Sequence, residues 1–314
     1  MQKKSMSRIL SENIGFFFII PWLIGFLCFK VYPFASSLYY SFTNYDLFTG
    51  ITKVGMMNYE KIFTDEDIIR AFKVTFKYAI FDVPLKLAFA LFIAYILNFK
   101  LKGVNFFRTA YYIPSILGGS IAIAILWRAV FNTDGLLNTV LAALGMQEIN
   151  WMASDNGAMA VIVLLRVWQF GSAMVIFLAA LKGVSQDLYE AASIDGSSNL
   201  RTFFRIALPL SKPILAVMVI FTMVAYWNDW FTALIYMSEK SKYPLQLALR
   251  QILIQSQATA TMMGNMDGGY AEANKITELI KFSSIVVGAV PMLIAYPFVQ
   301  KYFEKGFMAG AVKG

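Results

Sequence analysis

The side chains best suited to chemistry are ionisable groups that interrupt otherwise apolar stretches. Asp82 and Lys86 stand four positions apart around Pro84. Arg166 and Asp229 lie in two later apolar stretches. Because a charge at membrane depth is costly, each group is a functional hypothesis. For Asp82 and Lys86 the favoured interpretation is structural, since opposite charges four residues apart pair on one face of a helix.

Two clusters in these stretches combine aromatic rings with amide or carboxylate groups. Aromatic rings stack on the apolar faces of sugars, while amides and carboxylates bond sugar hydroxyls, so the clusters suit a carbohydrate. Tryptophans also collect at membrane interfaces, which leaves that alternative open for Trp227 and Trp230. We predict a substrate pathway at Trp168, Gln169, Tyr226, Asn228 and Asp229.

The sequence holds few of the groups on which catalysis and metal binding depend. It has no histidine and one cysteine, Cys28, so the usual zinc and general-base arrangements and an internal disulfide are excluded. No Gly-x-x-x-x-Gly-Lys-Ser/Thr phosphate loop is present. We therefore expect a non-catalytic chain with no catalytic residue, no metal and no cofactor of its own.

The composition is that of a membrane protein. Of 314 residues, 58% are hydrophobic and 15% are charged, against roughly a quarter charged in soluble domains. Apolar stretches of about 20 residues are long enough to cross a bilayer. We predict six transmembrane helices at residues 14–31, 72–97, 109–130, 158–181, 214–237 and 279–298, the first of them an uncleaved span.

Basic residues set the expected orientation. They concentrate in the short segments before the first span, after the second, after the fourth and after the sixth. The segment 131–157 carries three acidic residues and no lysine or arginine. By the positive-inside rule both termini are cytoplasmic. The expected organisation is a cytoplasmic tail at 1–13, a transmembrane domain at 14–303 that includes a cytoplasmic loop at 182–213, and a second cytoplasmic tail at 304–314. The basic residues form no arm or stripe suited to nucleic acid.

The loop at 182–213 contains a polar segment from Glu190 to Pro209. Its residues predict two short helices with a joint at Gly196, because Gly and Ser break a run of good helix formers. Pro209 and Pro213 are expected to stop the second helix and start the next one. An amphipathic loop lying on the bilayer surface is the alternative.

The segment resembles the EAA loop of ABC-importer permeases. That pattern is Glu-Ala-Ala, three residues, Gly, nine residues, Ile, any residue, Leu-Pro, and the spacing here is unbroken. The matching residues are Glu190, Ala191, Ala192, Gly196, Ile206, Leu208 and Pro209. The resemblance implies that the loop docks on a cytoplasmic ATPase, with Glu190 in a basic site and Asp195 with Arg201 or Arg205 forming a polar rim.

The resemblance extends over nearly the whole chain and is to the maltose-type, carbohydrate-uptake branch of these permeases. The opening at 20–26 is similar to the first permease subunit of such systems, whereas 226–230, 243–247 and 296–306 are more similar to the second. The mixture leaves the partner permease open, as a hetero- or homodimer.

The implied fold is the all-α type I importer permease with six transmembrane helices, in the bacterial cytoplasmic membrane. The implied partners are a second permease subunit, two ABC ATPase subunits that bind ATP and magnesium, an extracytoplasmic solute-binding protein, a sugar or oligosaccharide, and membrane lipids.

Three other classes stay open on the residues alone. An ion-coupled secondary transporter would use Asp82 and Asp229 as ion sites. A membrane-embedded hydrolase would depend on those two carboxylates or on Lys86. A structural membrane scaffold would keep the spans but would have no use for the spaced loop.

Overall fold

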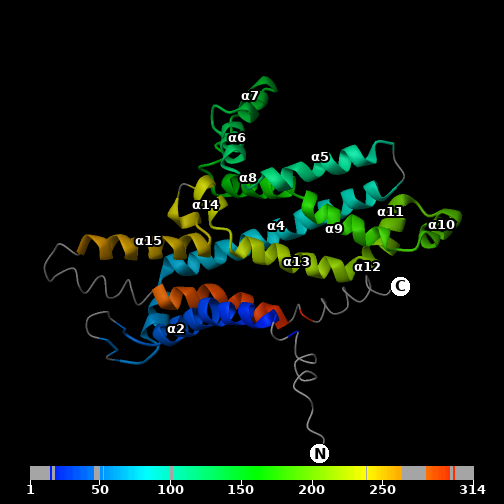
Figure 1. Ribbon diagram of the computed structural model, residues 1–314. Helices are drawn as coiled ribbons and strands as arrows, with labels where there is room; N and C mark the ends of the chain where they lie inside the picture. The colour runs from blue at the N-terminus through cyan, green and yellow to red at the C-terminus, as the bar shows by residue number, and fades with distance from the viewer. Residues whose placement is uncertain are drawn as a thin grey trace, which may run out of the picture. The chain divides into compact units, whose positions relative to one another are not determined.

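The structure is a computed structural model that describes residues 15, 18–45, 50, 51, 53–99, 102–237, 239–263, 281–297 and 300 (Figure 1). Helices are the regular elements of these residues, which otherwise contain one isolated antiparallel bridge between Thr43 and Val54. The predicted all-α class is therefore confirmed. The chain divides into two compact units, one formed by Met1–Asp65 and Gln251–Ala289, the other by Glu66–Arg250 and Val290–Gly314.

The first unit begins with a continuous helix over Phe18–Ser41 that includes the π-helix η1 (Leu27–Val31) and α2 (Tyr32–Ser41). Its most apolar window has no buried residue, and Phe18 and Phe29 are about four-fifths exposed, at 80% and 79%. The end of α2 is held by α3 (Met57–Thr64), where the buried Asn58 amide donates to the carbonyl oxygens of Ser41 and Thr43, both at 2.9 Å.

The second unit is organised around α4 (Glu66–Asn98), which packs against α8, α9 and α13 (Figure 1). Its acidic first turn suits the positive end of the helix dipole. Buried apolar side chains of α4, among them Leu87 and Leu91, meet Met174 and Phe177 of α9 in one core cluster. A second cluster surrounds Val161 of α8.

The remaining helices follow in order along the chain. They are α5 (Val104–Leu117), α6 (Ile121–Phe131), α7 (Leu136–Ala143), α8 (Asp155–Trp168), α9 (Gly171–Lys182), α10 (Gln186–Ile194), α11 (Asn199–Thr202), η2 (Phe203–Ala207), α12 (Leu208–Leu210), α13 (Lys212–Trp227), α14 (Phe231–Tyr236), η3 (Lys240–Lys242) and α15 (Leu245–Met263). A further apolar helix covers Lys281–Pro297.

Several of the predicted spans are broken rather than straight. Phe18–Ser41 and Glu66–Asn98 are single helices long and apolar enough to cross a membrane. Val104–Leu117 and Ile121–Ala143 form a pair bent by 97°, Asn156–Trp168 and Gly171–Lys182 a pair bent by 44°, and Asn199–Leu210 and Lys212–Trp227 a pair bent by 72°. An apolar helix thus stands at each predicted position, but the count of six crossings stays a prediction.

Within the expected span at 109–130, α5 ends at Leu117 and a new helix starts after Ser120. Ser120 caps that helix by accepting a hydrogen bond from the Ile123 amide at 3.3 Å. Within the expected span at 214–237, α13 ends at Trp227 and α14 follows from Phe231. The tails expected at 1–13 and 304–314 lie outside the described residues.

The break between α8 and α9 is fixed by hydrogen bonds to the end of α5. The Ser115 hydroxyl donates to the Gln169 carbonyl at 3.1 Å and accepts from the Ser172 amide at 2.9 Å. The Gln169 side chain donates to the Gly118 carbonyl at 3.1 Å. Gly171 starts α9 so close to Tyr111 that a Cβ would meet the backbone of α5.

Candidate functional site

The segment 182–213, which we call the docking loop, consists of two short helices joined by a glycine. Helix α10 ends at Ile194 and α11 begins at Asn199. Gly196 between them has φ +69°, in the left-handed region that favours glycine. Its amide donates to the Ser193 carbonyl at 3.1 Å. The predicted two helices with a joint at Gly196 are confirmed.

The second helix ends at Leu210, one residue after Pro209, so the predicted stop is confirmed to within one residue. Helical structure continues from Asn199 through η2 to Leu210, and the 72° bend follows before α13. Pro209 sits near the start of the short α12, where the missing N–H of proline is tolerated. The π-helical turn η2 just before it, which has a different hydrogen-bond spacing from an α-helix, also helps the helix to accommodate this proline. Pro213 stands at the start of α13, as expected.

The docking loop presents most of its predicted site residues at the surface. Glu190, Ala191, Asp195, Gly196 and Pro209 are exposed, Ile206 and Leu208 are half-buried, and Ala192 is buried. The loop also exposes large apolar side chains, with Ile194 at 86% and Phe204 at 62%. Apolar groups held out on a polar loop are typical of a surface that a partner covers.

The loop is attached to α4 on its inner side. The Tyr95 hydroxyl of α4 donates to the Asn199 carbonyl at 3.0 Å. Phe203 is buried against the rings of Phe92 and Tyr95. Burial raises the pKa of the Tyr189 phenol, so that side chain stays protonated under ordinary conditions. The loop is therefore fixed to the helix that organises its unit.

A second constellation, the ionic triad, lies about 24 Å along α13 from the docking loop, counting 1.5 Å per residue. Arg166, in the last turn of α8, bonds Asp82 of α4 through Nη1 and Asp229 through Nη2, the latter at 2.9 Å. The Asp82 side chain is fully buried, that of Arg166 is 9% exposed and that of Asp229 is 21% exposed. Both carboxylates are thus held by one guanidinium.

The expected pairing of Asp82 with Lys86 is wrong, because Asp82 pairs with Arg166 across two helices instead of along its own. The Arg166 guanidinium also lies over the Tyr226 ring, 4.0 Å from its centroid, and the Lys86 ammonium lies 5.5 Å from the same centroid. The planar guanidinium of Arg166 bonds two carboxylates at once, Asp82 and Asp229. The ammonium of Lys86 is a compact point charge and is less suited to such an arrangement.

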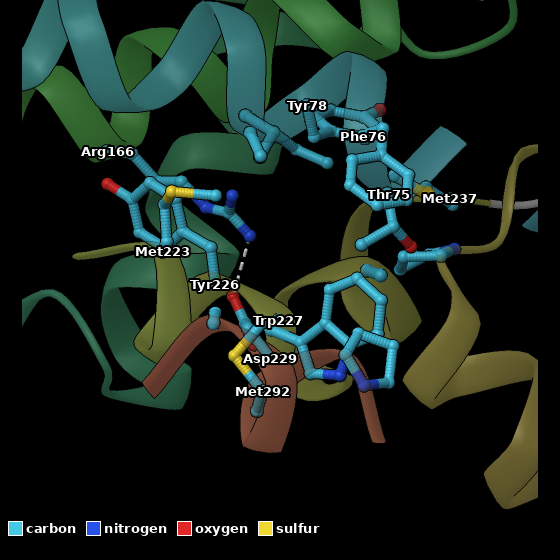
Figure 2. A pocket seen from close by; sticks show the side chains of 16 residues that line it. Thr75, Phe76, Tyr78, Arg166, Met223, Tyr226, Trp227, Asp229, Met237 and Met292 are labelled. Carbon is cyan, nitrogen blue, oxygen red and sulfur yellow. Dashed lines mark hydrogen bonds and ion pairs between the residues drawn. The ribbon is translucent and has the colours of Figure 1, made fainter. Parts of the chain in front are cut away.

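Two members of the triad, Arg166 and Asp229, border a cavity of about 130 Å³, which Figure 2 shows from close by. Arg166 and Asp229 are joined by their ion pair at its edge, and Tyr226 and Trp227 contribute aromatic surface. Trp227 is buried and packs against Phe76, with ring centroids 5.8 Å apart. It therefore lies inside the unit.

The predicted pathway residues separate into two groups. Tyr226 and Asp229 line the cavity. Trp168 packs on Trp127, with ring centroids 5.5 Å apart, Gln169 bonds α5, and the exposed Asn228 bonds the Val224 carbonyl at 2.9 Å. The structure therefore does not bring the five residues together, and the pathway assignment stays a prediction. Arg166 was noted in the sequence without a role, and its only signal there was a charge within an apolar stretch.

The chain has recognisable relatives. Residues 86–308 match the family described as binding-protein-dependent transport system inner membrane component. The chain is 48% identical over 215 residues to the probable ABC transporter permease protein YesP of Bacillus subtilis, covering 68% of this chain and 70% of that one. It is 31% identical over 229 residues to the multiple sugar-binding transport system permease protein MsmF of Streptococcus mutans, covering 70% and 77%.

A solved structure has the same fold. It is a bacterial alginate ABC transporter in complex with an alginate pentasaccharide-bound periplasmic protein, one chain of which matches with a TM-score of 0.75 at 18% identity, covering 94% of this chain and 96% of that chain. The resemblance read from the sequence is confirmed. The chain belongs to the binding-protein-dependent inner membrane components of ABC transporters, with their type I permease fold, and is a non-catalytic membrane transport subunit.

Proposed function

We propose that this permease forms the path for a sugar or oligosaccharide that an extracytoplasmic solute-binding protein delivers and that ATP hydrolysis on separate subunits drives inward. The docking loop is the observation that carries the proposal. It consists of two helices joined at the left-handed Gly196 and exposes Glu190 beside apolar side chains, which is a surface that a partner protein could bind. The substrate class is supported by MsmF, a multiple sugar-binding transport permease, and by the alginate transporter.

The partners that this function requires are a second permease chain, of the same or a different sequence, and two ATPase subunits on the cytoplasmic side. ATP and magnesium belong to those subunits. The distribution of basic residues supports a cytoplasmic docking loop and cytoplasmic termini in a bacterial cytoplasmic membrane. Glu190 suits a basic site on an ATPase, with Asp195 and Arg201 or Arg205 around it.

The mechanism is a lever. Closure of the ATPase dimer on ATP moves the docking loop, and α9 and α13 leave the loop at its two ends, at Lys182 and Lys212. Both helices pack on α4, so a displaced loop shifts packed helices against one another. The pathway between the two permease chains then opens on the other side of the membrane.

The ion-coupled alternative has less support from the geometry. It needs Asp82 and Asp229 as sites for a proton or a cation, yet Arg166 already bonds both carboxylates. A cation entering there would compete with a guanidinium that is itself buried, which is unfavourable. Uptake that survives ATP depletion and collapses with the ion gradient would nevertheless establish that alternative.

The test is Glu190→Arg in the full complex, reconstituted in proteoliposomes with the partner permease, the ATPase subunits and the binding protein. We expect normal membrane insertion, a loss of sugar uptake of at least tenfold, and a matching loss of binding-protein-stimulated ATP hydrolysis. Glu190→Gln removes the charge without reversing it, so its sugar uptake should lie between that of the wild type and that of Glu190→Arg. Wild-type uptake and stimulation in Glu190→Arg would contradict the proposed docking.

A further inference from the structure

The ionic triad occupies a distinctive place in the second unit, at the far ends of the two helical paths that leave the docking loop. One path, the first arm, runs from Lys182 back through α9 and across the break to Arg166, in the last turn of α8. The other, the second arm, runs from Lys212 through α13 to Asp229, just before α14. Figure 1 shows α9 and α13 running from the docking-loop helices towards α8 and α14.

Each member of the triad also stands beside an irregularity in its helix. Arg166 precedes the 44° break between α8 and α9, and Asp229 lies between α13 and α14. Asp82 stands two residues before Pro84, whose missing N–H removes a backbone hydrogen bond within α4. Breaks and prolines are the positions at which helices change direction, so the triad links three such positions.

The two halves of the triad differ in their surroundings. Asp82 is fully buried on α4, so its bond to Arg166 fixes the first arm to the organising helix. Asp229 is partly exposed and borders the cavity. Its Oδ2 accepts from Arg166, while its Oδ1 accepts from the Thr232 amide at 3.1 Å and so caps α14. The Arg166–Asp229 bond is therefore the one that joins the first arm to the second.

We propose that Arg166 is a positioning residue that ties the far ends of the two arms together, so that movement of the docking loop reaches both arms as one displacement. The arms are then joined at both ends, by the docking loop at one and by the Arg166–Asp229 pair at the other. Without that pair each arm bends at its own break, and part of the loop movement is lost before it reaches the pathway. This inference rests on the proposed function.

The bond is suited to that task. Arg166 makes two separate carboxylate bonds from one planar group whose face is covered by Tyr226, so its orientation is fixed from three sides. Leaving a charge without its partner in such surroundings is strongly unfavourable. The arms therefore remain joined through small displacements.

The first experiment uses Asp229→Asn in the reconstituted complex. The variant keeps an oxygen that can cap α14 but removes the charge that Arg166 binds. We expect normal amounts of assembled complex, with the number of ATP molecules hydrolysed per sugar rising about tenfold, within the usual range of coupling free energies. Asp134→Asn, the same change at an exposed position, is the matched control and should behave as wild type.

A purely structural role would lower the amount of complex in the membrane without changing the ATP hydrolysed per sugar. Arg166→Lys supplies a second measurement, because it keeps the charge and loses the fork that reaches two carboxylates. It should give an intermediate ratio. A wild-type ratio in both Asp229→Asn and Arg166→Lys would overturn the inference.

A distance measurement tests the tie without any transport. Nitroxide labels at Leu164→Cys and Leu234→Cys, both exposed, report on α8 and α14 in a Cys28→Ser background. We expect one narrow distance distribution in the parent chain and a broader one after Asp229→Asn. An unchanged distribution would refute the tie. If the wild-type complex does not transport a sugar, the proposed function fails, while a broadened distribution would still establish the tie.

Discussion

The substitution Gly196→Ala isolates the backbone geometry of the docking loop from every other property of that position. Gly196 has φ +69°, and a Cβ built there would meet no atom within 4 Å. The change therefore introduces no clash. Its cost is that of holding an L-residue in the left-handed region, about 1–2 kcal/mol.

That cost appears in partner binding if the free loop of Gly196→Ala relaxes out of the left-handed region and the ATPase subunit binds only the conformation seen here. A difference of about 1.4 kcal/mol changes an equilibrium constant tenfold, so the affinity of the ATPase for the permease should fall about 5- to 30-fold. Gly196→Asn should lose less, because asparagine enters the left-handed region more readily than other residues with a Cβ.

The assay is a titration of purified ATPase subunits against the permease complex in nanodiscs. Gly145→Ala is the matched control, because Gly145 has φ +74° and open space for a Cβ but follows α7, away from the docking loop. It should bind the ATPase with wild-type affinity. Unchanged affinity in Gly196→Ala, or an equal loss in Gly145→Ala, would show that the loop geometry does not determine docking.

Two further substitutions test how the unit is held together. Tyr95→Phe removes the hydroxyl that bonds the Asn199 carbonyl, so we expect the free energy of loop opening to fall by about 1 kcal/mol. The measurement is hydrogen exchange of the loop amides, which should become faster. Unchanged exchange would mean that aromatic packing alone holds the loop. Gly171→Ala places a Cβ against the backbone of Tyr111 and should lower the melting temperature in detergent and the amount of folded chain. Gly119→Ala, where a Cβ meets nothing within 4 Å, should do neither, and equal losses in both variants would contradict the close approach of α5 and α9.

The docking loop could be predicted from the sequence because its signals are local. Gly196 breaks a helix wherever good helix formers surround it, and the spaced pattern from Glu190 to Pro209 depends on no distant residue. Hydropathy located the apolar helices for the same reason. The bends were missed, because Gly118 and Gly119 are compatible with a continuous apolar helix until contacts such as the bond from Gln169 to Gly118 fix the turn.

The ionic triad could not be predicted, since its partners are far apart in the chain. Asp82 and Lys86 satisfied a local rule, and that rule favoured the wrong pair. Nothing in a single sequence shows that Arg166 faces Asp82 across helices, 84 positions away. Trp168 and Gln169 show the same limit, because aromatic and amide groups that suit a sugar serve packing and helix attachment equally well.

The exposed helix Phe18–Ser41 has a consequence for how this sequence is free to vary. Its apolar window has no residue buried within the chain, and apart from the stacking of Trp22 on Phe26, with ring centroids 5.3 Å apart, packing within the chain sets few limits on side-chain size or shape there. Lipid tails adapt to side chains of different shape but penalise charge. Exchanges among large apolar residues should therefore be nearly neutral along this helix, whereas equal changes of volume at Leu87 or Phe177 in the core should not be. Among related permeases, side chains of the first helix should therefore differ readily in shape and rarely in polarity.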